Sequence, residues 1–128
     1  MTQPAVAYTG QGVDVFAPAA ADLSSSQFNI VKLTSTGVAV CSATTDRPFG
    51  ILQNTPTAGQ GALVRVLGAS RCVSGASGLT MGSVVAPTAS GAAQAAVSTQ
   101  YPVGWSMAAA SSGDTFTVHV HTAWSALP

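Results

Sequence analysis

The chain has 128 residues, of which only 6% are charged, with four basic side chains against four acidic ones. A chain of this length forms one domain with a hydrophobic core of its own. Because the net charge is zero, the sequence offers no basic surface for nucleic acid or for an anionic membrane. A surface made of Ala, Ser, Thr and Gly favours a protein that packs against copies of itself or a partner, although secreted bacterial proteins can share this composition.

Residues 1–22 have little helical periodicity and contain no basic segment followed by an apolar run, as a secretory signal would. We expect them to form an extended N-terminal arm with a short strand at Val13–Phe16, and residues 23–128 to form a β domain. Such an arm is ordered only where something holds it, so it either grips a partner or caps its own barrel. Without a secretion signal or a membrane-spanning run, Cys41 and Cys72 are expected to be buried and reduced, while their pairing stays open.

The rest of the chain is predicted to contain two copies of one unit, separated by the distance from Pro48 to Pro102 (102 − 48 = 54). Residues 28–68 align with residues 82–122 without a gap. Because Gly and Pro fix turn geometry, their repetition indicates a duplicated fold. The identical pairs are Val31/Val85, Thr34/Thr88, Gly37/Gly91, Ala39/Ala93, Thr45/Thr99, Pro48/Pro102, Gly50/Gly104, Gly59/Gly113, Val64/Val118 and Val66/Val120.

Each copy predicts the same series of short β elements. The β-branched runs 29–33 and 83–86 are strands that lead to a glycine turn. Gly50 and Gly104 mark either a bulge or a close approach of two backbones. The segment 108–110 could be helical, but a loop fits it equally well. The sequence therefore predicts an all-β protein, a small barrel or sandwich built from two tandem β repeats.

The last strand of each copy alternates in character, which predicts one buried and one outward face. The predicted core face carries Ala62, Val64 and Val66 in the first copy and Phe116, Val118 and Val120 in the second. The opposite face carries Leu63, Arg65 and Leu67, and then Thr117, His119 and His121.

Catalytic chemistry has little support in this sequence. A Ser–His–Asp set could be assembled from His119, Asp114 and one of many serines, but the abundance of serine makes such a set unspecific. No G-x-S-x-G motif follows a strand and opens a helix, as a nucleophile elbow requires. We predict that the protein is not an enzyme and has no catalytic residues.

His119 and His121 point the same way on a strand and could supply half of a zinc site. No further ligand lies at motif spacing, and the first copy has Arg65 and Leu67 at the equivalent positions. We therefore predict no metal and no cofactor, although a three-fold oligomer could bring histidines of neighbouring subunits together.

The segments FNIVKLTSTG, PFGILQNTPTAG, ALVRVLG and PVGWSMAAASSG carry a resemblance that extends from Phe28 to Thr122. In them the chain resembles the small capsid decoration proteins of tailed bacteriophages, also called cement or capsid-stabilising proteins. The resemblance implies a virion protein made in the host cytoplasm and placed on the outer capsid surface. It also implies the major capsid protein as partner, a homo-oligomer with a trimer favoured, and an N-terminal segment that grips the shell.

Two binding hypotheses follow from these observations. For a decoration protein, the expected capsid contacts are Tyr8, Val13, Val15 and Phe16 in the arm, or Leu63, Arg65 and Leu67 on the barrel rim. The alternative is a binding module for glycans or a cell surface, which an exposed Trp105 or Trp124 would support. A small β core needs aromatic side chains, so we expect the core to hold the aromatic residues Phe28, Phe49, Trp105, Phe116 and Trp124.

Overall fold

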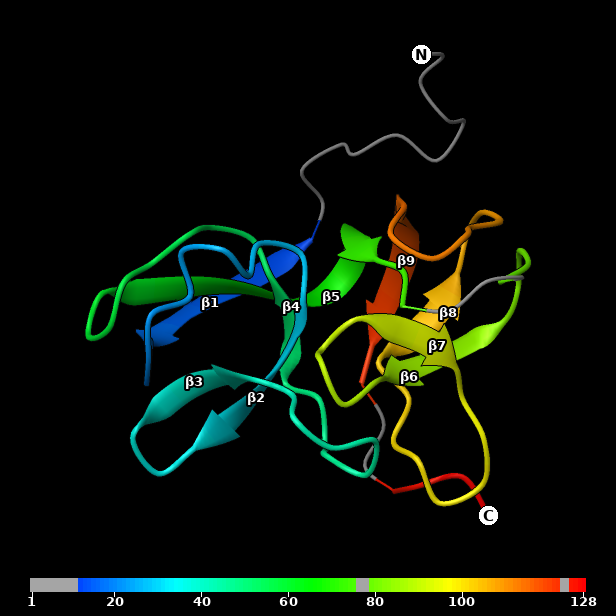
Figure 1. Cartoon of the computed structure of the whole chain (residues 1–128), viewed down its shortest axis with the longest axis horizontal. Helices are drawn as coiled ribbons and strands as arrows, with labels where there is room; N and C mark the ends of the chain where they lie inside the picture. The colour runs from blue at the N-terminus through cyan, green and yellow to red at the C-terminus, as the bar shows by residue number, and fades with distance from the viewer. Residues whose placement is uncertain (1–11, 76–78, 123–124) are drawn as a thin grey trace, which may run out of the picture.

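The computed structural model describes residues 12–75, 79–122 and 125–128. These residues contain nine strands and no helix, which confirms the prediction of an all-β, barrel-like protein (Figure 1). No helix able to cross a membrane occurs in these ranges. The strands are β1 (Val13–Pro18), β2 (Ile30–Thr34), β3 (Gly37–Val40), β4 (Gly50–Leu52), β5 (Gly61–Val73), β6 (Val84–Pro87), β7 (Ala93–Ala95), β8 (Gly104–Ser106) and β9 (Thr115–His121).

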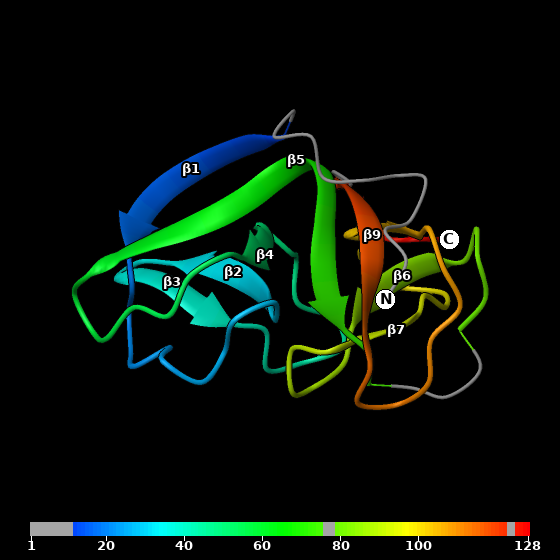
Figure 2. The same ribbon diagram turned by 90° about the horizontal axis from the view of Figure 1, so that it is seen from above.

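The strands form one antiparallel sheet in the order β3-β2-β4-β5-β9-β8-β6-β7, with β1 added beside the first half of β5. Figure 2 shows that the long strand β5 runs through both halves of the molecule and bends between them. Gly68, with φ of +105°, lies in the middle of β5, where its partner changes from β1 to β9. The sheet is thus divided at Gly68 into two curled halves.

The two halves use the same pairings, and the register agrees for all of these pairs except β6–β7, which is shifted by one residue relative to β2–β3. Leu52 pairs with Val64 between β4 and β5, and Ser106 pairs with Val118 between β8 and β9 (106 − 52 = 118 − 64 = 54). We call residues 13–67 the first unit and residues 68–122 the second unit. Each unit has five strands, because the first half of β5 ends the first unit and its second half begins the second unit.

Strand β1 occupies in the first unit the place that the second half of β5 occupies in the second. Phe16 pairs with Leu63, and Arg71 pairs with Thr117. The expected strand at Val13–Phe16 is therefore present and extends to Pro18. Residues 12–22 of the segment expected to be an arm thus include a strand of the sheet, whereas residues 1–11 lie outside the described part of the chain.

A parallel bridge closes each unit into a small barrel. In the first unit Ala19, just after β1, pairs with Val38 of β3. In the second unit Ser74, just after β5, pairs with Ala93 of β7. Figure 1 shows the two barrels side by side, with the first unit on the left.

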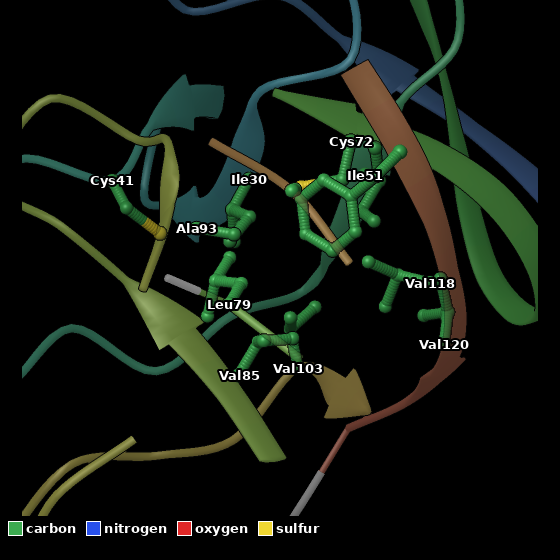
Figure 3. Packing of buried hydrophobic residues seen from close by; sticks show 12 residues of the cluster. Ile30, Cys41, Ile51, Cys72, Leu79, Val85, Ala93, Val103, Val118 and Val120 are labelled. Atoms are coloured by element: carbon green, nitrogen blue, oxygen red, sulfur yellow. The ribbon is translucent and has the colours of Figure 1, made fainter. Parts of the chain in front are cut away.

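The predicted core faces are buried in both units. Val64, Val118 and Val120 are completely buried, and Val66 is half-buried against the first core. The first core consists of Ala19, Leu23, Val31, Val38, Leu52, Ala62 and Val64. The second core consists of Cys72, Leu79, Val85, Ala93, Val103, Ala110, Phe116, Val118 and Val120, together with Ile30, Cys41 and Ile51 of the first unit (Figure 3). The two units therefore share one continuous hydrophobic contact.

Both cysteines are buried and free, as expected. Burial raises the pKa of the Cys41 and Cys72 thiols to about 12. Thiolate reactivity at neutral pH is therefore suppressed in the folded protein.

Gly50 and Gly104 lie at points where the backbones of two neighbouring strands approach each other closely. A Cβ at Gly50 would collide with the backbone carbonyl oxygen of Arg65, and a Cβ at Gly104 with that of His119. Because the obstacle is the backbone of the neighbouring strand, no rotamer change can relieve it. These glycines let β4 and β8 lie against the strands that follow them.

Replacing Gly50 or Gly104 by Ala should lower the free energy of unfolding by about 3 kcal/mol or more, because the strand pair must separate. Gly59→Ala is the matched control: its Cβ meets no atom within 4 Å, and only its φ of +83° is unfavourable. That substitution should cost about 1–2 kcal/mol. Urea unfolding of the three variants measures the difference, and equal losses would contradict the close approach.

Stability should fall as pH rises above about 8.5, because the unfolded chain then ionises its thiols while the folded protein keeps them protonated up to about pH 12. Below about pH 8.5 the thiols add no pH dependence to the free energy of unfolding, because they are protonated in both states. Cys72→Ala should make the fall between pH 8.5 and 10 shallower, whatever its cost at pH 7. An unchanged slope would show that the thiol does not titrate differently in the two states.

Candidate binding surface

The histidine pair does not form a metal site within the described residues, where no group of three His, Cys, Asp or Glu side chains could hold an ion. His119 and His121 instead flank Trp105, with ring centroids 4.8 and 6.2 Å from the Trp105 ring. Asp114 accepts a hydrogen bond from the Ser111 N–H (3.0 Å) in a turn. These side chains thus have structural contacts of their own.

The candidate contact residues on the arm and on the barrel rim prove to be neighbours. From the sequence we expected two alternative surfaces. In the structure, however, β1 pairs with β5 along its whole length. Val13 lies opposite Leu67, and Phe16 lies opposite Leu63. Tyr8 lies outside the described residues.

This paired face is apolar and accessible. Phe16 is 69% exposed, and Val13 and Leu67 are also exposed, while Leu63 and Arg65 are half-buried. We call Val13, Phe16, Leu63 and Leu67 the β1–β5 surface. Val15 belongs to the other face, because it packs against the core of the first unit.

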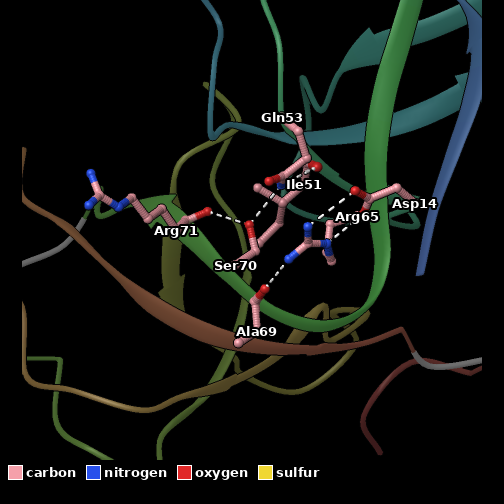
Figure 4. A network of polar contacts seen from close by, with 7 residues as sticks. All are labelled: Asp14, Ile51, Gln53, Arg65, Ala69, Ser70 and Arg71. Atoms are coloured by element: carbon pink, nitrogen blue, oxygen red, sulfur yellow. Dashed lines mark hydrogen bonds and ion pairs between the residues drawn. The ribbon is translucent and has the colours of Figure 1, made fainter. Parts of the chain in front are cut away.

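An ion pair between Arg65 and Asp14 neutralises the charge beside this surface (Figure 4). Arg65 Nε and Nη2 both donate to the Asp14 carboxylate, the Nη2–Oδ2 distance being 3.1 Å. Arg65 Nη1 donates to the Ala69 carbonyl, beyond the bend at Gly68. One guanidinium therefore holds β1 against β5 and connects the two halves of β5.

A second accessible apolar face lies in the second unit and was not predicted. Trp105 is 43% exposed and lies opposite Val84 and His119 in the sheet, so the expectation that it belongs to the core is wrong. Phe116 is buried, and Phe28 and Phe49 pack against the two cores, as expected; Trp124 lies outside the described residues. No local sequence pattern predicts this exposure, because the pairing of Trp105 with His119 joins two separate strands.

Comparison with known proteins shows a shared fold. No protein-family model matches the chain, and no curated protein matches it in sequence. Among solved structures, the chain is similar to the N base of head fiber gp8.5 of bacteriophage phi29, with a TM-score of 0.64. The match covers 91% of this chain and 98% of that chain at 16% sequence identity. At this identity the likeness concerns the fold alone.

Removal of residues 1–11 should leave the sheet intact, because all strands described here follow this segment. Removal of residues 1–20 also deletes β1 and uncovers the core beneath Val15 and Ala17. We expect the longer deletion to lower the free energy of unfolding by at least about 3 kcal/mol. Denaturant unfolding of both truncations tests this, and equal stability would contradict a structural role for β1.

Proposed function

We propose that the chain is a structural protein of a phage virion that binds the outer surface of the assembled capsid and stabilises it by bridging capsid subunits. The observation that carries the proposal is the fold shared, over almost the full length of both chains, with the base of a phage head fiber. The sequence resemblance to capsid decoration proteins supports the same class of protein.

The charge distribution is compatible with binding through apolar contacts. The ion pairs Lys32–Asp46 and Arg65–Asp14 use two of the four basic and two of the four acidic side chains of the chain. Binding then rests on buried apolar area, which contributes about 25 cal/mol per Å² before the cost of association. Such binding depends only weakly on salt.

The partner in this proposal is the major capsid protein. A subunit that touches two capsid subunits makes its second contact intramolecular, which raises the overall affinity by about 10²–10⁴. Because only the assembled lattice offers both contacts, binding stabilises the shell by mass action. A homo-oligomer such as a trimer would multiply this effect, and neither nucleic acid nor a membrane is involved.

A second candidate function is a glycan-binding module displayed on a virion. The observation that favours it is the exposed indole of Trp105, since aromatic faces stack on sugar rings. The imidazole of His119 lies 4.8 Å from this ring and would flank a bound sugar.

The β1–β5 surface can be tested by co-sedimentation of the purified chain with assembled capsids of the phage that encodes it. Phe16→Ser and Leu67→Ser should each weaken binding about 5- to 10-fold, corresponding to about 1–1.4 kcal/mol. Met81→Ser is the matched control, because Met81 is 72% exposed but lies in the second unit. Wild-type affinity should change little between low and high salt.

Three results would count against this proposal. The chain could fail to sediment with capsids, bind dispersed capsid subunits equally well, or bind capsids unchanged after both substitutions. Loss of binding through Trp105→Ser together with competition by soluble glycans would instead favour the second candidate.

A further inference from the structure

The two units of the chain are joined by a specific contact between a face of the first and a turn of the second. Ile30 and Ile51, from β2 and β4, are completely buried and belong to the core cluster that contains Cys72. The Ile30 N–H donates to the Gly91 carbonyl (2.7 Å). We call this arrangement the intrachain contact.

A polar side chain borders the intrachain contact. Asn29 Nδ2 donates to the Ser90 carbonyl oxygen at 3.2 Å. Ser90 and Gly91 form the turn between β6 and β7, and together with Cys72 they make up what we call the receiving surface of the second unit. The contact thus combines buried apolar side chains with hydrogen bonds to one turn of the second unit.

The second unit has a strand pair equivalent to the one that carries Ile30 and Ile51, but its side chains are exposed. Val84 and Trp105 are the equivalents of Ile30 and Ile51 (84 − 30 = 105 − 51 = 54), and they pair with each other as the isoleucines do. Trp105 is 43% exposed, whereas Ile51 is 0% exposed. We call Val84 and Trp105 the Trp105 face.

The first unit repeats part of the receiving surface in its turn between β2 and β3. Thr36 is the equivalent of Ser90, because each backbone N–H donates to the hydroxyl oxygen of the threonine two residues before it, and Ala17 is the equivalent of Cys72 in the register of the sheet. The β6–β7 turn is one residue longer than the β2–β3 turn, so Gly91 has no exact counterpart. Thr36 is exposed and Ala17 is half-buried, whereas Cys72 is buried. Each molecule therefore carries an exposed Trp105 face and an exposed turn that corresponds to the turn of the intrachain contact.

We infer that the Trp105 face of one molecule docks on the receiving surface of the first unit of a second copy of this chain. The intrachain contact is the argument for this occupant, because it packs the equivalent strand positions of one unit beside the equivalent turn of the other. The association is head to tail, so it produces a closed ring or a filament. This inference concerns the isolated chain and does not depend on capsid binding.

The mass of the purified full-length chain, followed by light scattering over increasing concentration, tests the role of Trp105. We expect an oligomer that Trp105→Ser and Val84→Ser shift to at least tenfold higher concentration. Met81→Ser should leave it unchanged, because the equivalent of Met81 is Gln27 (81 − 54 = 27), which is exposed outside the intrachain contact. Circular dichroism confirms that the variants fold. A wild-type monomer at all concentrations, or an oligomer insensitive to both substitutions, would overturn the inference.

Disulfide trapping tests the head-to-tail geometry. Ser83 is the equivalent of Asn29, and Thr36 is the equivalent of Ser90, so these positions should meet between molecules. Oxidation of a mixture of Ser83→Cys and Thr36→Cys chains should give a covalent heterodimer, and the double variant should give larger covalent products. The native cysteines are buried and should not interfere. Dimers of Ser83→Cys alone would indicate a two-fold interface and overturn the head-to-tail arrangement.

Discussion

The hydrogen bonding of β5 is the constraint on which the rest of the structure depends. This strand of 13 residues pairs with β1 and β4 in its first half and with β9 in its second half. Each half of β5 completes the backbone pairing of its own unit, and Ile30 and Ile51 of the first unit are buried in the core of the second. Arg65 strengthens the junction by binding Asp14 of β1 and the Ala69 carbonyl across the bend. We therefore regard the two units as one cooperative domain.

Backbone geometry is retained between the units even where the side chains differ. The Ala43 N–H donates to Asp46 Oδ2 at 3.0 Å, and the Val97 N–H donates to Gln100 Oε1 at 3.0 Å. Burial alone would raise the pKa of Asp46, but hydrogen bonds from Ser42, Lys32 and Ala43 outweigh it and lower that pKa. A charged and a neutral acceptor thus support the same turn, because the turn requires only an oxygen at that position.

The two accessible apolar faces lie on different units and therefore can serve different partners. The β1–β5 surface belongs to the first unit, and the Trp105 face belongs to the second. A subunit that binds copies of itself through one surface and a lattice through the other gains affinity from every added contact. The low charge is compatible with both contacts, because neither has to remove water from unpaired ions.

The sequence by itself determined the all-β fold, the spacing of 54 residues and the valine core faces, because these depend on local alternation and turn chemistry. It marked Gly50 and Gly104 as special positions but left a bulge and a close approach open, and the structure shows the close approach. It did not reveal the partner of β1, since VDVFAP and its counterpart GASRCV have no identical residue at equivalent positions, and pairing between distant segments leaves no local pattern. Only the tertiary structure decided that Ile51 is buried and Trp105 exposed, although both hold the same place in their units. The physical reason is that Ile51 packs against the second unit, whereas no third unit lies against Trp105 within the described part of the chain.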